Sequence, residues 1–252
     1  MVISTVRQRD ANARDKEETT RSGFVQACVR IGQELGSVPR YRVGLIQGLF
    51  TLLALALTMF FAWQWPLPLD PRVQAASGGW LYQVLDLISL PGFAPWNAVM
   101  VAIVCAVVAL WLGWQHGVYL VLLTLFQGFV SLLLKILIPI ERPAEVDVNA
   151  PVAAINKAFP SGHVMLFVVF FGFLFYLVST RLSRSLIQLL LLGLFTIMIV
   201  LGGASRLYLG AHWPVDVIGA QIIGFIILVV GIEIYERAVA PQMERTYDGE
   251  DA

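Results

Sequence analysis

The chain has 252 residues, of which 58% are hydrophobic and only 13% are charged. A soluble domain usually carries about a quarter charged residues, so this composition excludes an ordinary soluble domain and indicates a protein of the lipid bilayer. The formal net charge is zero, so no general affinity for nucleic acid is expected.

The polar N-terminal stretch, residues 1–42, is mixed in charge, and we expect it to be a solvated tail. It is a poor match to the leading region of a cleaved signal peptide because it is too long. The apolar run that follows has the length of a full membrane span. We therefore expect that run to be retained as the first membrane helix.

Six apolar stretches reach or approach the length of about 20 residues that a membrane-spanning helix needs. They are Val43–Trp63, Trp96–Trp114, Val118–Ile138, Val164–Thr180, Leu186–Ala204 and Val215–Tyr235. The sequence therefore predicts an all-α integral membrane bundle of six helices, with a membrane domain over residues 43–236 and a second tail over 237–252. Gln115-His116-Gly117 is predicted as the tight turn between the second and third spans, and 181–184 as the turn between the fourth and fifth.

The segment between the first two spans, Pro66 to Pro95, contains an amphipathic stretch. Such a stretch suits the membrane interface, where a helix could flank the place at which a lipid enters. The alternative is ordinary packing against the bundle, which we favour. The apolar residues that share one helical face are Trp80, Leu81, Val84, Leu85 and Ile88.

The distribution of basic residues predicts the orientation, because cytoplasmic segments are enriched in Lys and Arg. With both termini in the cytoplasm, twelve of the 17 basic residues lie inside and five lie outside. Three of those five belong to the polar clusters described next, so they have a separate reason to be there. The N- and C-termini are therefore predicted to be cytoplasmic.

Polar and charged residues gather in three clusters at the predicted ends of spans, all on the outer side. Charged groups in or beside a membrane span are costly and are usually functional. The three clusters are Lys135-x6-Arg142-Pro143, Pro160-Ser161-Gly162-His163 and Ser205-Arg206-x5-His212-x3-Asp216.

The residue types in these clusters suit the binding of a phosphate group. Lys135, Arg142 and Arg206 supply three positive charges, and the arginine fork matches pairs of phosphate oxygens. Ser161 and Gly162 precede a helix, where free N–H groups and the helix dipole favour an anion. No cluster of Cys and His suggests a metal site, and the predicted chemistry requires neither a metal nor another cofactor.

Two histidines can share the displacement of a leaving group from phosphorus. His212 is the better candidate nucleophile, because Asp216 lies one turn further on and can orient the ring. His163 has no such partner in the sequence and suits a general acid. Taken singly, each residue has an ordinary alternative, such as a lysine that snorkels or an aspartate that caps a helix. If all of these alternatives held, the residues would lie together on one membrane face only by chance.

The three clusters, in this order and spacing, resemble the three-part signature of the type 2 phosphatidic acid phosphatase superfamily. The resemblance implies a six-helix membrane fold and metal-independent hydrolysis of a phosphate ester through a phosphohistidine. It implies that His212 is the nucleophile, Asp216 its orienting group and His163 the acid. The residues that it implies bind phosphate are Lys135, Arg142, Ser161, Gly162 and Arg206.

The expected substrate is a phospholipid or isoprenoid phosphate, of the polyprenyl diphosphate, phosphatidylglycerophosphate or phosphatidate class, met at the outer face of the cell membrane. Lys157 lies near the site and could contact the second phosphate of a diphosphate, and Glu141 could pair with Arg142 or face water. One alternative is a lipid phosphotransferase that passes the phosphate to another acceptor. Another is a transporter or lipid-binding protein, against which the absence of an internal repeat speaks.

Overall fold

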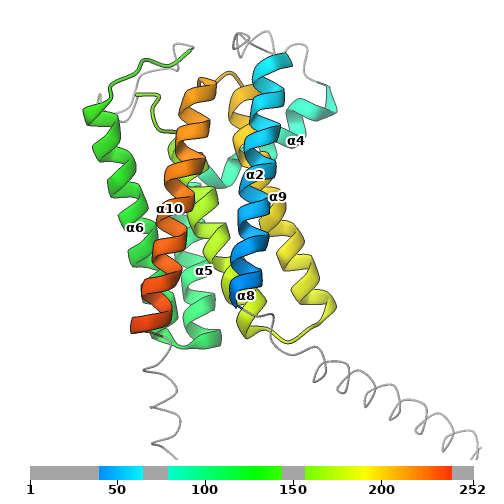
Figure 1. Ribbon diagram of the computed structural model, residues 1–252, viewed down its shortest axis with the longest axis vertical. Coiled ribbons are helices and arrows are strands. Elements are labelled where there is room, and N and C mark those ends of the chain that lie inside the picture. The colour runs from blue at the N-terminus through cyan, green and yellow to red at the C-terminus, as the bar shows by residue number, and fades with distance from the viewer. Residues whose placement is uncertain (1–39, 65–78, 144–156, 240–252) are drawn as a thin grey trace, which may run out of the picture.

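The computed structural model describes residues 40–64, 79–143 and 157–239, and every regular element within them is helical (Figure 1). The all-α prediction is therefore confirmed for this part of the chain. The elements are α2 (Arg40–Gln64), α4 (Trp80–Ser89), the 3₁₀ turn η1 (Leu90–Gly92), α5 (Trp96–Leu112), α6 (Trp114–Leu137), α7 (Gly162–Leu166), the π-helical turn η3 (Phe167–Phe171), α8 (Gly172–Arg181), α9 (Leu186–Tyr208) and α10 (Pro214–Ala238).

The described helices make this a multi-pass membrane protein. Four helical runs are long and apolar enough to cross a bilayer: Trp114–Leu137, Gly162–Arg181, Leu186–Tyr208 and Pro214–Ala238. A fifth span is possible if α4–η1 and α5, which meet at 66°, count as one broken helix, and the apolar described part of α2 is the shorter run Ile46–Phe60. Each of the six predicted stretches falls on a helix, but the count of six spans stays a prediction.

The continuous run α7–η3–α8 is the central helix of the bundle. In its most apolar window 83% of the residues are buried inside the protein, compared with 28% to 39% in the other three long spans. Phe167, Phe170 and Phe173 are among its fully buried side chains. The surrounding helices instead turn side chains such as Leu110 outward, as expected for surfaces that meet lipid.

The turn between α5 and α6 differs from the prediction. Gly113 alone separates the two helices, with a φ of 109° that favours glycine. His116 therefore lies inside α6, where its Nδ1 is 2.5 Å from the hydroxyl of Tyr235. Gly117 also lies inside α6, and a Cβ there would come 2.7 Å from the carbonyl oxygen of Cys105. The prediction of the turn at Gln115-His116-Gly117 from its polarity is therefore wrong, because the positive φ of Gly113 determines where α5 ends.

The amphipathic segment forms α4, which packs against α9. Leu85 and Ile88 are buried, as the packing interpretation predicts. Trp80 and Val84 are exposed, at 75% and 40%, so only part of the predicted face is covered by protein. Residues 66–78 lie outside the described part of the chain.

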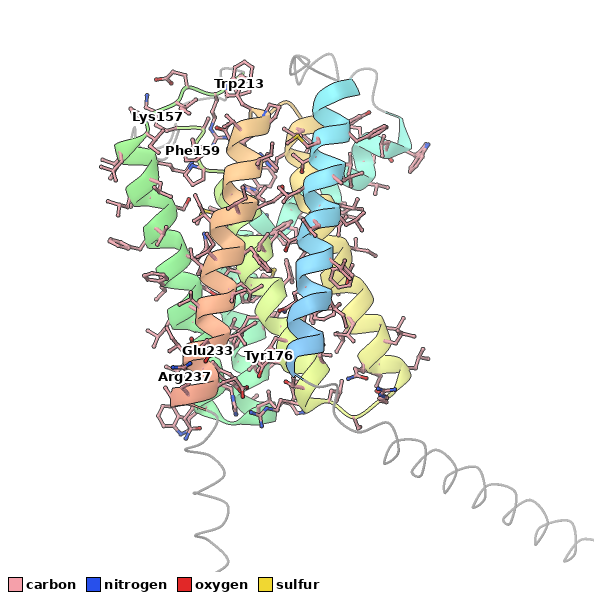
Figure 2. The ribbon with its side chains drawn as sticks, viewed as in Figure 1. Lys157, Phe159, Tyr176, Trp213, Glu233 and Arg237 are labelled. Carbon is pink, nitrogen blue, oxygen red and sulfur yellow. The ribbon has the colours of Figure 1, made fainter. Side chains whose placement is uncertain are left out.

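The two ends of the bundle differ in which loops they carry. The start of α2 and the end of α10 lie at the same end (Figure 1). Lys157, Phe159 and Trp213 lie at the opposite end from Tyr176 and Arg237 (Figure 2). The predicted cytoplasmic tails, 1–42 and 237–252, lie almost wholly outside the described residues, and the side of the membrane that each end faces stays a prediction.

Candidate active site

The three sequence clusters meet at the end of the bundle opposite the start of α2. Lys135 lies in the last turn of α6, Arg206 in the last turn of α9, and Asp216 in the first turn of α10. His163 is the second residue of the central helix. His212, between α9 and α10, interacts electrostatically with Lys135, Arg142, Arg206 and His163. Residues up to 81 positions apart in the sequence thus share one site, counting from Lys135 to Asp216.

His212 and Asp216 form a buried pair. The Nδ1 atom of His212 lies 3.5 Å from the Oδ2 atom of Asp216, and both side chains are almost fully buried. The same Oδ2 atom accepts a hydrogen bond of 2.8 Å from the backbone N–H of Trp213. The carboxylate therefore caps α10, as the ordinary alternative proposed, and also faces the imidazole.

Arg142 lies beside the other nitrogen of the His212 ring. Its Nη1 atom is 3.5 Å from Nε2 of His212 and donates to the carbonyl oxygen of Ala211 at 3.3 Å. Since the guanidinium can only donate, Nε2 faces it as an acceptor, and the ring hydrogen belongs on Nδ1, toward Asp216. This tautomer, assigned from the neighbouring groups, keeps Nε2 unprotonated, with its lone pair on the side of Arg142.

The surroundings of His212 favour its neutral form. Burial lowers the pKa of His212 well below 6.5, and the positive charges of Arg142, Arg206 and Lys135 lower it further. Burial also lowers the pKa of Arg142, while the negative charge of Asp216 raises it. Arginine nevertheless stays protonated at neutral pH. The loop thus presents an uncharged imidazole next to a cation.

The second cluster is tied to the third by the backbone. The N–H of Ser161 donates to the carbonyl oxygen of Asp216 at 3.1 Å, and Ser161 is fully buried. Gly162 begins the central helix, and a Cβ on it would lie 3.5 Å from Oγ of Ser131. The start of the central helix is therefore held against the first turn of α10.

Lys135 is buried rather than extended toward the membrane surface. It is 7% exposed, and its ammonium donates to the carbonyl oxygen of Lys157 at 2.5 Å. The snorkelling alternative is therefore wrong for this residue. The Lys157 ammonium pairs with Glu141, whose carbonyl oxygen accepts from the indole N–H of Trp213 at 2.9 Å. These contacts join the loop after α6 to the loop before α10.

Arg206 and His163 share contacts with residues that the sequence did not point to. Nη1 of Arg206 donates to Oγ of Ser89 at 2.8 Å. The Phe93 ring lies under the Arg206 guanidinium, with 5.1 Å from Cζ to the ring centroid, and meets the His163 ring edge to face at 4.6 Å. Ser89 and Phe93 stand in the amphipathic segment, and no local sequence pattern marks them as part of a site.

Several buried polar atoms at this end have no hydrogen-bond partner among the described residues. Such atoms are rare in proteins, and a cluster of them marks a functional site or a place for a bound ligand, ion or water. The atoms on the hydroxyl, the imidazole and the guanidinium can each donate to an anion, whereas Nδ1 of His212 faces Asp216. They are Ser161 Oγ, His163 Nε2, Arg206 Nε, His212 Nδ1 and Asp216 Oδ1.

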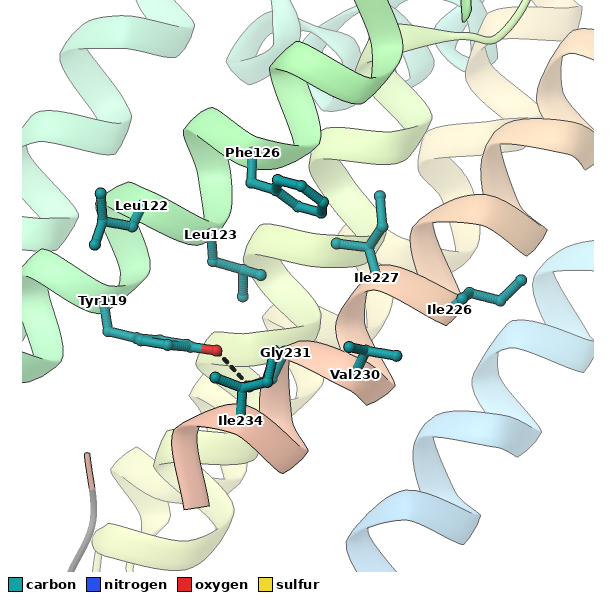
Figure 3. A pocket seen from close by; sticks show the side chains of 9 residues that line it. All are labelled: Tyr119, Leu122, Leu123, Phe126, Ile226, Ile227, Val230, Gly231 and Ile234. Carbon is teal, nitrogen blue, oxygen red and sulfur yellow. Dashed lines mark hydrogen bonds between the residues drawn. The ribbon is translucent and has the colours of Figure 1, made fainter. Parts of the chain in front are cut away.

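An apolar groove of about 450 Å³ lies elsewhere, between α6 and α10 (Figure 3). Its one polar side-chain group is the hydroxyl of Tyr119, which donates to the carbonyl oxygen of Gly231 at 2.5 Å. None of its lining side chains carries a charge, so the groove suits hydrocarbon and not phosphate. The lining residues are Tyr119, Leu122, Leu123, Phe126, Ile226, Ile227, Val230, Gly231 and Ile234.

Comparison with known proteins identifies the family. The sequence profile of the PAP2 superfamily matches residues 116–240, which include all eight predicted site residues. No curated protein matches the chain. Among solved structures, the fold is similar to the crystal structure of a transmembrane PAP2 type phosphatidylglycerolphosphate phosphatase from Bacillus subtilis. The two are 23% identical, with a TM-score of 0.55, and the match covers 78% of this chain and 98% of the other. The chain therefore belongs to the PAP2 superfamily through the segment that carries the whole candidate site.

Proposed function

We propose that this chain hydrolyses a lipid phosphate or diphosphate through a phosphohistidine formed on His212. The observation that carries the proposal is the convergence of three cations and two imidazoles on one cluster of unpaired buried polar atoms. A tetrahedral anion satisfies donors on Ser161, His163 and Arg206 together. Membership in the PAP2 superfamily and the fold of a membrane phosphatase also support the hydrolysis of a lipid phosphate.

In the first half of the reaction, Nε2 of His212 attacks phosphorus. The N–P bond forms while the P–O bond to the lipid breaks, and His163 gives its proton to the leaving oxygen. Asp216 holds the Nδ1–H and stabilises the positive charge that develops on the ring. Lys135, Arg142 and Arg206 balance the negative charge on the transferring group, which is the main catalytic task in phosphoryl transfer.

In the second half, water attacks the same phosphorus atom. His163, now neutral, takes a proton from the water as the new O–P bond forms and the P–N bond breaks. Inorganic phosphate leaves, and His212 returns to its neutral form. This cycle uses only side chains of the protein, so we expect it to proceed without a metal ion.

The substrate is proposed to approach from within the membrane at its outer face. The excess of basic residues in the predicted cytoplasmic segments supports that orientation. The loop from Pro143 to Pro160 is too short to hold a separate soluble domain, so the site lies close to the headgroup layer. Polyprenyl diphosphate, phosphatidylglycerophosphate and phosphatidate are the substrate classes to compare.

Phosphate release from this panel of lipids by purified protein, with EDTA present, tests the proposal. Release should survive chelation and disappear in His212→Ala. His116→Gln is the matched control, because His116 is also buried but lies at the other end of α6. A requirement for a divalent metal, or an active His212→Ala, would refute the mechanism. Release that needs an added alcohol acceptor would instead identify a phosphotransferase.

A further inference from the structure

The segment from the end of α4 towards the start of α5, residues 86–93, contacts two of the proposed active-site residues and lies outside the family motifs. Ser89 ends α4, and Phe93 follows the 3₁₀ turn η1. We propose that Ser89 and Phe93 are positioning residues that hold Arg206 and His163 in place for the bound phosphate. This inference rests on the proposed function, because it assigns these two residues a role at the same site.

Ser89 fixes Arg206 through a chain of hydrogen bonds that runs in one direction. Nη1 of Arg206 donates to Oγ of Ser89 at 2.8 Å, and Oγ of Ser205 donates to the carbonyl oxygen of Gly202 at 2.8 Å. The hydroxyls of Ser89 and Ser205 are 3.3 Å apart. Since the Ser205 hydrogen is already used, Ser89 donates to Ser205. Every hydroxyl is thereby satisfied, and Ser89 is fully buried.

The Phe93 ring holds two side chains without occupying their hydrogen-bonding atoms. It lies under the Arg206 guanidinium at 5.1 Å from Cζ, a cation–π contact, and meets the His163 ring at an interplanar angle of 77°. Nε of Arg206 and Nε2 of His163 are both buried without a protein partner. The aromatic contact thus orients both groups while it leaves these donors for the ligand.

Two further features of the same segment fit this arrangement. A Cβ on the buried residue Gly92 would overlap the His163 ring, so the backbone of η1 passes directly against that imidazole. The carboxylate of Asp86, one turn before Ser89, attracts the Arg206 guanidinium electrostatically. The segment therefore contacts the site through the Ser89 hydroxyl, the Phe93 ring and the backbone at Gly92.

The first experiment replaces Ser89 and measures turnover together with inhibition by inorganic phosphate. Hydrogen bonds to charged groups are strong enough that Ser89→Ala should lower kcat/KM about tenfold and weaken phosphate inhibition by a similar factor. Ser89→Thr, which keeps the hydroxyl, should recover most of the loss. Ser89→Cys keeps a side chain of similar size, but its sulfur is a weak hydrogen-bond acceptor. It should therefore lose activity as Ser89→Ala does, which separates loss of the hydrogen bond from any folding defect caused by the smaller alanine.

The second experiment replaces Phe93. Phe93→Leu keeps an apolar side chain but removes the ring face, and should lower kcat/KM about three- to tenfold, whereas Phe93→Tyr should stay near wild type. In a double-mutant cycle, the combined loss of Ser89→Ala with Arg206→Lys should be smaller than the product of the separate losses, because both changes act on one contact.

Matched controls lie away from the site: Ser179 is near the end of α8, and Phe195 is in the middle of α9. Ser179 is a buried serine whose hydroxyl donates to the carbonyl oxygen of Phe175 at 2.6 Å, and Phe195 is a buried ring stacked on Phe171. Ser179→Ala and Phe195→Leu should not alter phosphate inhibition. The inference is overturned if the Ser89 and Phe93 variants match these controls in phosphate inhibition and kcat/KM. If His212→Ala is inactive in the same assay, that result leaves the proposed function intact, whereas an active His212→Ala would remove it.

Discussion

One oxygen of Asp216 serves both a helix and a histidine. Oδ2 accepts the backbone N–H of Trp213 at 2.8 Å and lies 3.5 Å from Nδ1 of His212. The first contact stabilises the start of α10, and the second sets the tautomer of the proposed nucleophile. These two roles can be separated by substitution, because an amide oxygen can still cap a helix but carries no negative charge.

Asp216→Asn should lower kcat by about a hundredfold or more, since the amide no longer stabilises the positive ring that forms during attack. Its thermal stability should stay close to wild type because the cap is kept. Asp216→Ala should lose the same activity and, in addition, about 1 kcal/mol of stability. Phosphate release and thermal unfolding measure the two effects. Full activity in Asp216→Asn would contradict the role of the carboxylate.

The pH profile should show a nucleophile that remains neutral in mild acid. Burial and the nearby cations hold the pKa of His212 well below 6.5. The acid limb of kcat/KM that belongs to His212 should therefore lie below pH 6.5. The stability that this residue contributes is present above pH 6.5, where both folded and unfolded forms are neutral, and is lost as the pH falls and the unfolded chain takes up a proton.

A substrate phosphate also titrates, with a pKa of about 6, so the profile has to be measured with both a monophosphate and a diphosphate lipid. A limb that stays at the same pH in both profiles and lies away from the pKa of either phosphate belongs to the enzyme. A shared limb on the acid side, with its midpoint at or above pH 6.5, would show that His212 is charged at the start of the reaction, contrary to the mechanism.

The pair Lys157 and Glu141 should affect diphosphates selectively. The Lys157 ammonium pairs with Glu141, whose side chain is 80% exposed, and such exposed pairs are weak. A second phosphate can therefore compete with Glu141 for the ammonium. Lys157→Ala should lower kcat/KM for a diphosphate lipid only, and Glu141→Gln should raise it. An equal loss on mono- and diphosphates, or no loss, would contradict a role in binding the second phosphate.

Gly117→Ala should lower the thermal stability of the protein. A Cβ at this position would come 2.6 Å from Cβ of Ala109 and 2.7 Å from the carbonyl oxygen of Cys105, so α5 and α6 would have to move apart. Overpacking of this kind costs about 1–3 kcal/mol. Gly128→Ala, on the same helix, is the control, because nothing lies within 4 Å of its added Cβ. It should leave stability unchanged or raise it slightly.

The sequence predicted most of the helices and grouped the motif residues that the fold brings together, because both leave local signals. Apolar runs of membrane length fall on the described helices, and the three motifs meet at one end of the bundle. The turn at Gly113 was missed because polarity, and not backbone conformation, was used to place it. The π-helical turn η3 was also missed, since its sequence, Phe-Val-Val-Phe-Phe, is as apolar as the helix around it.

The contribution of α4 and η1 could not be predicted from the sequence. Ser89 and Arg206 are 117 positions apart, and a serine in an amphipathic helix carries no signal for a distant arginine. The contact depends on how α4 packs against α9, which only the folded chain determines. The motif residues, by contrast, could be grouped in advance because their spacing resembles that of a known family.

The hydrogen bond from the N–H of Ser161 to the carbonyl oxygen of Asp216 joins main chain to main chain. Replacing Ser161 by alanine, or Asp216 by asparagine or alanine, removes neither atom of this bond. The loops that carry the proposed acid and the proposed nucleophile consequently keep the same position relative to each other in these variants. A loss of turnover in those variants then measures missing chemistry, and not a displaced loop.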